Sequence, residues 1–221
     1  MIKTLYHGSQ TAEVEPKFGL GSDFHDYGAG FYLTDRAELA AEWAVYRPNS
    51  LDGWIHAFEL DLDGLKVFDF REAGVLSWIA ELMKHRAADE SSAYRRRAPI
   101  FISRYGIDLL SYDVVVGWRA DASYFYIAKA FVRDEIDVSA LDGLLKLGGF
   151  GIQYTVKSER AYRQLKSLPD QRLPVVFSEK HADYVRRDSA ARDKMRELIA
   201  DPGFNKLERL FSDIIREETR V

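Results

Sequence analysis

Three short segments of this sequence combine residue types that can bind a ligand or take part in a reaction. Residues 5–9 (LYHGS) place His7 beside Gly8, residues 28–34 (GAGFYLT) carry Tyr32, and residues 151–156 (GIQYTV) carry Gln153. An imidazole can donate or accept a hydrogen bond, a glycine lets another group approach the backbone closely, and aromatic rings can stack on a planar cation. Each segment alone is a weak signal, and their order and spacing in one chain are more specific.

Several common catalytic frameworks are absent from the sequence. The chain has no cysteine, which excludes disulfides, cysteine-ligated zinc, iron–sulfur clusters and thiol nucleophiles. It has no P-loop and no G-x-S-x-G elbow, and Leu33 stands where a Rossmann G-x-G-x-x-G run needs its third glycine. The histidines form no i,i+4 pair and no H-E-x-x-H run, so no metal site is expected among them. They are His7, His25, His56, His85 and His181.

The composition fits one large globular domain that is not attracted to nucleic acid by its overall charge. The chain has 221 residues, 47% hydrophobic content and a formal net charge of -4. The arginine run at 95–97 is therefore interpreted as a solvated surface rather than a nucleic-acid patch. The sequence shows neither a signal peptide nor a run of about 18 apolar residues, so we expect a cytoplasmic protein without a membrane span.

These candidate residues must be held in place by short strands and helices. Alternating and apolar runs predict strands, whereas a 3.6-residue period predicts helices. The predicted strands are residues 2–7, 30–34, 54–61, 65–70, 112–118, 151–156 and 173–178. The predicted helices are residues 35–47, 75–86, 121–132, 139–147 and 158–165. We expect the first helix to begin with a capping box formed by Asp35 and Glu38.

The irregular mixture of strands and helices predicts the α+β class rather than a doubly wound sheet. We expect one domain over residues 1–178 and a charged helical extension over residues 179–221, with a break at 201–203. Both halves of the extension are amphipathic, so each needs a surface to cover. Either this domain or a partner can provide that surface.

The three segments together resemble the ADP-ribosyltransferase superfamily, in its diphtheria-toxin-like and poly(ADP-ribose)-polymerase-like branch. More closely, the chain is similar to a bacterial domain family of unknown function placed in that superfamily. Its pattern has Y-H-G-[ST], D-F-G-x-G-F-Y-L-T, A-x-x-W-A, W…R, V-G-x-x-A-D and a strand led by glutamine. The matching positions are residues 6–9, 27–34 and 40–44, Trp78 with Arg86, residues 116–121, and Gln153. The resemblance covers about residues 1–168.

The resemblance implies a split β-sandwich surrounded by helices that uses NAD as its substrate and needs no metal. It places His7, Tyr32 and Gln153 at the catalytic positions. Nicotinamide leaves through an oxocarbenium-like transition state, as in glycoside cleavage. The positions that it implies for NAD binding are His7, Gly8, Ser9, Tyr32, Trp43, Arg86 and Asp121. Among these, Tyr32 and Trp43 can sandwich the nicotinamide ring, and Arg86 can hold the pyrophosphate as a bidentate cation.

Gln153 departs from the superfamily pattern, which has a glutamate at this position. An amide keeps the hydrogen-bonding shape but loses the charge that stabilises the transition state. This argues against polymer elongation and leaves mono-ADP-ribosyl transfer, NAD hydrolysis or binding without turnover. Asp121 is the candidate for a compensating carboxylate. The size and form resemble toxins of toxin–antitoxin or phage-defence systems, with a protein or nucleic-acid acceptor and an antitoxin docked on the C-terminal helices.

Each of these residues also has a purely structural interpretation. Tyr32 and Trp43 can belong to the core, Gln153 can be an exposed strand residue, and Arg86 is more often solvated. Asp23 and His25 can be turn residues. The remaining alternative is an interaction protein that assembles through its charged C-terminal helices.

Overall fold

The computed structural model describes residues 1–85, 92–119, 122–146 and 151–218 and has the predicted α+β architecture. Its described strands form one mixed seven-stranded sheet in the order β4-β5-β6-β2-β1-β3-β7. The strands are β1 (Ile2–Ser9), β2 (Phe31–Thr34), β3 (Gly53–Asp61), β4 (Val67–Asp69), β5 (Val114–Trp118), β6 (Ile152–Val156) and β7 (Leu165–Val175). Strands β4 and β5 are parallel, and every other neighbouring pair is antiparallel.

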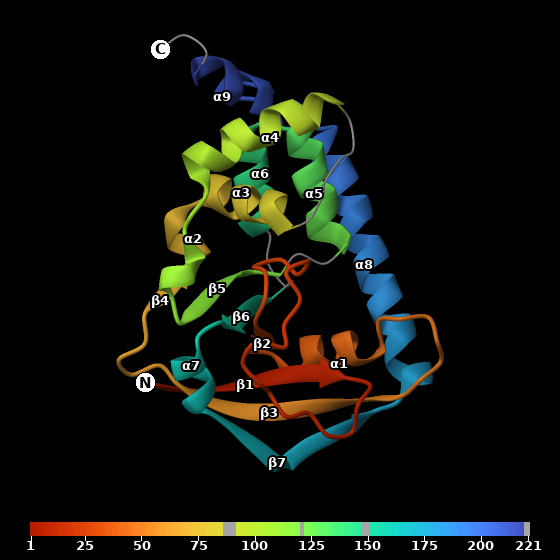
Figure 1. Ribbon diagram of the computed structural model, residues 1–221. Helices are drawn as coiled ribbons and strands as arrows, with labels where there is room; N and C mark the ends of the chain where they lie inside the picture. Colours follow the sequence, from red (N-terminus) through yellow and green to blue (C-terminus); the bar gives the residue numbers. More distant parts are fainter. Residues whose placement is uncertain (86–91, 120–121, 147–150, 219–221) are drawn as a thin grey trace.

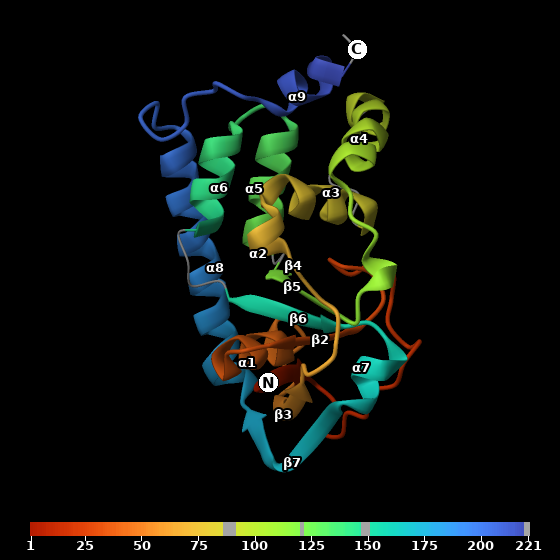
Figure 2. The ribbon, with the colours of Figure 1, turned by 90° about the vertical axis from the view of Figure 1, so that its left-hand side faces the viewer.

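Helices gather at one end of the molecule above the sheet (Figures 1 and 2). This group contains α2 (Phe70–Ala73), α3 (Val75–His85), α4 (Ser92–Tyr105), α5 (Ala122–Val132), α6 (Val138–Lys146) and α9 (Phe211–Glu218). Helix α1 (Ala37–Val45) packs on β1, and α7 (Glu159–Arg163) precedes β7. The long helix α8 (Phe177–Ile199) runs along the side of the molecule and contacts both α1 and α5.

Strand β5 is buried on both faces because two hydrophobic cores meet across it. Val115 packs in the core beneath the helices, together with Trp78 and Phe131. Its neighbours Val114 and Val116 point the other way, since side chains alternate along a strand. They share a second core with residues of β1 and β3, although three strands separate β5 from β3 in the sheet order. The sheet therefore curves so that its two halves enclose this second core.

The amphipathic faces of the C-terminal extension are covered by this same chain. Met195 of α8 and Phe211, Ile214 and Ile215 of α9 all lie in the core beneath the helices. Burial of apolar side chains is the main favourable contribution to such packing. The apolar faces of these amphipathic helices therefore pack against the domain of the same chain.

Two local predictions are wrong. The capping box does not form, because α1 begins after Arg36 and no side chain caps it. Of the last predicted strand, residues 173–178, only the first half is a strand: it is the end of β7, which starts at Leu165 and ends at Val175, whereas α8 begins at Phe177.

Candidate functional site

A cavity of about 850 Å³ lies beside the loop of residues 10–30, hereafter the β1–β2 loop. Its walls also include residues of β1, β2, β6, α1, α5 and α8. The cavity brings together five of the predicted site residues from distant parts of the sequence. They are His7, Gly8, Tyr32, Trp43 and Gln153.

His7 lies near the end of β1 with its ring against Phe31, the two ring centroids being 4.6 Å apart. Its Nδ1 is 2.8 Å from the carbonyl oxygen of Tyr32, so Nδ1 must carry the hydrogen and donate it. Burial lowers the pKa of His7 from 6.5 to about 4, the Tyr32 carbonyl opposes this shift, and the nearby His56 adds to it. At neutral pH the ring is therefore uncharged, and its Nε2 can accept a hydrogen bond from a ligand hydroxyl.

The lowered pKa of His7 predicts a pH dependence of stability. The unfolded chain binds a proton at His7 below about pH 6.5, whereas the folded chain binds it only below about pH 4. The contribution of His7 should therefore be constant above pH 6.5 and should fall as the pH drops from about 6.5 towards 4. Urea unfolding of wild type and His7→Gln over this range measures it. A difference between the two proteins that does not change with pH would contradict the prediction.

The glycine at position 8 is required by the packing of α1 against β1. A Cβ atom on Gly8 would lie 1.8 Å from the carbonyl oxygen of Ala40 and 2.8 Å from the amide nitrogen of Ala44. Gly8 lines the cavity, but its missing side chain faces this helix. Ser9, the next predicted residue, is not among the residues of the cavity wall. Its hydroxyl accepts a hydrogen bond from the amide of Thr11 at 3.1 Å.

Tyr32 both lines the cavity and holds the β1–β2 loop. Its hydroxyl donates to the Gly28 carbonyl at 2.6 Å and accepts from the Tyr27 amide at 2.9 Å. The rings of His25 and Tyr32 pack in an edge-type contact with their centroids 5.3 Å apart. The Tyr32 hydroxyl thus makes its hydrogen bonds to the loop, and a ligand in the cavity can contact the Tyr32 ring.

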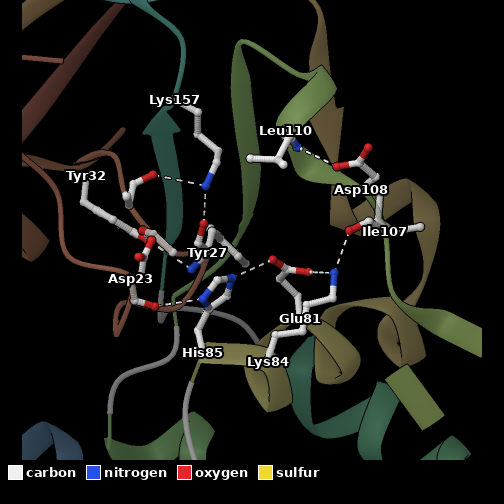
Figure 3. Close-up of polar contacts among 12 residues, drawn as sticks. Asp23, Tyr27, Tyr32, Glu81, Lys84, His85, Ile107, Asp108, Leu110 and Lys157 are labelled. Atoms are coloured by element: carbon white, nitrogen blue, oxygen red, sulfur yellow. Dashed lines mark hydrogen bonds and ion pairs between the residues drawn. The ribbon is translucent and has the colours of Figure 1, made fainter. Parts of the chain in front are cut away.

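Further side chains, which are not part of the cavity wall, hold the β1–β2 loop in place (Figure 3). Lys157 donates to the carbonyl oxygens of Tyr27 and Ala29. His85 bridges the Asp23 carbonyl, at 2.8 Å, and a carboxylate oxygen of Glu81, at 3.0 Å. Both ring nitrogens of His85 thus contact oxygen atoms, one on the loop and one on α3.

Tyr27 anchors the same loop to the core beneath the helices. Its side chain is fully buried, its hydroxyl donates to the Trp118 carbonyl at 2.7 Å, and it accepts from the Trp78 indole at 3.0 Å. Burial raises the pKa of Tyr27 well above 10, and the charge of Asp26 raises it further. The hydroxyl therefore stays protonated, as its role as a donor requires.

Gln153 is buried and contacts a carboxylate. Its Nε2 donates to Oδ2 of Asp26 at 3.1 Å, and the two residues are only 2% and 6% exposed. Both lie on the cavity wall. Asp26 is not among the residues predicted from the sequence. The available signal was its place directly before Tyr27, at the aspartate of the D-F-G-x-G loop pattern.

An ion-paired cluster joins α1 to α8 at the cavity wall. The Glu42 carboxylate receives two hydrogen bonds of 2.7 Å from Arg187 and one of 3.3 Å from Arg119. The Arg119 guanidinium lies over the ring of Trp43 at 4.9 Å, and that of Arg187 lies 5.9 Å from the ring of Tyr184. Trp43, Arg119 and Tyr184 line the cavity, so α8 contributes to its wall through Tyr184.

Two predicted site residues, Arg86 and Asp121, lie outside the described residues. Among the residues that are described, no group of three or more His, Cys, Asp or Glu side chains could hold a metal ion. None of the helices in this part of the chain is both long and apolar enough to cross a bilayer.

Fold and site together define an α+β domain with a polar and aromatic cavity beside a curved mixed sheet. The chain belongs to the family described as "Protein of unknown function (DUF3990)", whose match spans residues 3–167. No curated protein and no solved structure matches the chain. Helix α8, with its contribution to the cavity, lies beyond the matched residues.

Proposed function

We propose that this protein is an NAD-dependent mono-ADP-ribosyltransferase whose reaction takes place in the 850 Å³ cavity. The observation that carries the proposal is the assembly of His7, Tyr32 and Gln153 in one cavity wall. These residues come from β1, β2 and β6, in the order that the superfamily pattern requires. The curved sheet, whose halves enclose a shared core, supports the split β-sandwich of that superfamily.

The dimensions and polarity of the cavity suit a dinucleotide. Ligand pockets commonly measure about 300–1,000 Å³ and combine apolar walls with a few polar groups. His7 can accept a hydrogen bond from a ribose hydroxyl, and the Tyr32 ring can stack on the pyridinium. Trp43 already carries the Arg119 guanidinium over its ring, so we assign this pair to a more distant part of the dinucleotide.

The reaction breaks the bond between ribose C1′ and the nicotinamide nitrogen. The electron pair of that bond stays with nicotinamide, which leaves as a neutral molecule. An oxygen or nitrogen atom of the acceptor then forms the new bond to C1′ and loses its proton to solvent. When water is the acceptor, the same chemistry is NAD hydrolysis.

A macromolecular acceptor, protein or nucleic acid, fits the surface near the cavity. The β1–β2 loop exposes Phe18, Leu20 and Phe24, and Leu20 also lines the cavity. Exposed apolar groups of this kind are typical of interaction sites. We propose that the protein acts in the cytoplasm as the toxin of a toxin–antitoxin or phage-defence system. An antitoxin on the C-terminal helices would meet their charged outer faces, because the apolar faces are buried.

Nicotinamide release from NAD by the purified chain tests the proposal. We expect turnover by wild type and a loss of at least about tenfold in His7→Gln, because a transition-state hydrogen bond is removed. His56→Gln is the matched control: His56 pairs with His7 across β1 and β3 but does not line the cavity. It should stay within about twofold of wild type, because glutamine can keep the hydrogen bond to the Thr11 carbonyl and residue 56 does not line the cavity.

The second candidate function is a module that binds NAD or ADP-ribose without turnover, which the uncharged Gln153 favours. Calorimetry separates it from the enzyme. Saturable NAD binding without nicotinamide release would support the module, and no binding at all would exclude both functions.

A further inference from the structure

We propose that the acceptor of the ADP-ribosyl group is a carboxylate side chain of a protein and that Tyr162, on the wall of the 850 Å³ cavity, binds it. The Tyr162 hydroxyl donates a hydrogen bond to this carboxylate, one oxygen of which attacks ribose C1′. The inference rests on the proposed function and identifies the class of acceptor and a residue that contacts it.

Tyr162 lies where two cavities adjoin. It lines the 850 Å³ cavity and also a second cavity of about 510 Å³. Gly21 and Gly30 of the β1–β2 loop likewise belong to both walls, so this loop separates the two spaces. Tyr162 is therefore within reach of a ligand in either cavity.

The part of the first cavity beside Tyr162 remains for the acceptor. The cavity wall includes Tyr162 of α7 and Tyr184 of α8, and these two helices lie on opposite sides of the molecule (Figures 1 and 2). Trp43 and Arg119, at the end beside α8, are assigned above to a more distant part of the dinucleotide. The end beside α7 is then open to the group that receives the ADP-ribosyl moiety.

The Tyr162 hydroxyl can donate a hydrogen bond to a ligand. It makes no hydrogen bond with any residue that the structure describes. Burial raises the pKa of Tyr162 to about 12, so the hydroxyl stays protonated at neutral pH and cannot act as a base there. The ring packs against Phe18 with the centroids 5.9 Å apart, and Ser158 caps α7 by accepting a hydrogen bond from the Ala161 amide at 3.1 Å. These contacts hold the ring in place.

A protonated phenol favours one kind of acceptor group. An alcohol, an amine or a guanidinium must lose a proton as it bonds to C1′, and Tyr162 cannot take that proton. A carboxylate needs no such step: one oxygen forms the bond to C1′, the bond from C1′ to nitrogen breaks, and its electron pair leaves with neutral nicotinamide. The product is an ester, and no proton is exchanged. An ionised oxygen is also the stronger hydrogen-bond acceptor for the phenol.

Two ammonium groups of the second cavity also favour an anionic acceptor. Lys84 and Lys157 line this cavity, and each donates two hydrogen bonds within the described ranges, so one of its three N–H groups is left. Three carboxylates share the wall. That of Glu81 is paired with Lys84 at 2.7 Å, whereas Asp23 and Asp108 are exposed, so solvent and salt screen their charges. A carboxylate in this cavity can therefore receive a hydrogen bond from either lysine.

The apolar side chains of the second cavity favour a protein as the carrier of that carboxylate. Phe18 and Leu110 line the cavity and are 56% and 92% exposed. Exposed apolar groups beside a cavity are typical of protein interaction sites, whereas nucleic acid is attracted by positive charge, and this chain has a net charge of -4. We therefore expect an acidic residue that is flanked by apolar residues.

Transfer from NAD labelled in its adenine to a copolymer of glutamate and leucine tests the proposal. Wild type should attach the label through an ester, which neutral hydroxylamine cleaves. In Tyr162→Phe the rate of transfer should fall by about tenfold or more, the scale of one hydrogen bond to a charged group. Nicotinamide release with water as the acceptor should keep its wild-type rate, because the hydroxyl contacts the acceptor and not the dinucleotide. This rate also reports that the variant is folded.

Tyr112→Phe is the matched control. The Tyr112 ring packs on Phe68 with the centroids 5.0 Å apart, its hydroxyl has no hydrogen-bond partner in the described part of the chain, and it lines neither cavity. Its loss should change neither transfer nor hydrolysis. Leu110→Glu tests the second cavity. It should raise the KM for the copolymer and leave hydrolysis unchanged, because it removes an apolar contact and adds a like charge.

The outcomes separate this inference from the proposed function. If wild type releases nicotinamide but does not label the glutamate copolymer, or instead labels a copolymer of lysine and leucine or single-stranded DNA, the acceptor is not a protein carboxylate. If Tyr162→Phe loses transfer and hydrolysis equally, or loses neither, Tyr162 does not bind the acceptor. In both cases the proposed function stands. If wild type releases no nicotinamide, the proposed function fails and the inference fails with it.

Discussion

Replacing Glu42 with alanine is expected to lower the free energy of unfolding by about 3 kcal/mol, the scale for breaking a buried ion pair. The carboxylate is 15% exposed and accepts hydrogen bonds from Arg187 and Arg119. The Arg119 side chain is only 5% exposed. Removal of Glu42 therefore leaves the guanidiniums of Arg119 and Arg187 close together without the carboxylate that both of them contact. Urea unfolding of both proteins measures the change.

The same substitution is expected to weaken ligand binding, because the cluster sets the relative positions of α1 and α8. Trp43 and Tyr184 line the cavity, and each lies beneath one of the two guanidiniums. Calorimetry with ADP-ribose measures the change in affinity separately from the change in stability.

Glu38→Ala is the matched control for Glu42. Glu38 lies on the same helix, is 78% exposed and pairs with Arg36 at 4.0 Å. Exposed pairs contribute about 0–1 kcal/mol, so this variant should unfold almost as wild type does. Equal effects of the two substitutions would show that the buried cluster does not hold α1 and α8 together.

The elements that the sequence predicted are those in which local pattern and final packing agree. Strand β5 follows from its run of three valines, since β-branched residues favour strands and both faces are buried. The full length of β7 could not be read locally, because Pro169 resembles a turn signal. The strand tolerates proline because it lies at the edge of the sheet and pairs only with β3. Helix α4 was missed for a similar reason, since Pro99 lies inside it.

The residues of the candidate site could be predicted where they belong to a short sequence motif. The positions of His7, Tyr32 and Gln153 followed from short motifs, and the structure brings them into one cavity wall. The pairing of Asp26 with Gln153 and that of Glu42 with Arg187 did not follow, because each joins residues that lie far apart in the sequence. Gln153 lies 127 positions from Asp26, and Arg187 lies 145 from Glu42. Such partners are set by the curvature of the sheet and the path of α8, which no local pattern encodes.

Replacing Gly8 with alanine is expected to cost about 3 kcal/mol of folding free energy, at the upper end of the range for overpacking. The new Cβ would stand 1.8 Å from a backbone oxygen of α1, and a backbone atom cannot move aside as a flexible side chain can. Helix α1 would have to shift away from β1. The expected result is a lower midpoint of urea unfolding, together with weaker ADP-ribose binding, because α1 carries Trp43.

Gly203→Ala provides the control for Gly8. The atom nearest to a Cβ there is a side-chain oxygen of Asp201 at 3.2 Å, so its effect should stay within about 0.5 kcal/mol. The pair of measurements also separates two reasons for the glycine at position 8. If Gly8→Ala leaves stability unchanged but abolishes ligand binding, the glycine serves the approach of the dinucleotide to the backbone. If stability and binding fall together, the close contact of α1 with β1 explains why a glycine stands at position 8. In that case His7, and not Gly8, is the residue of this motif that contacts the ligand.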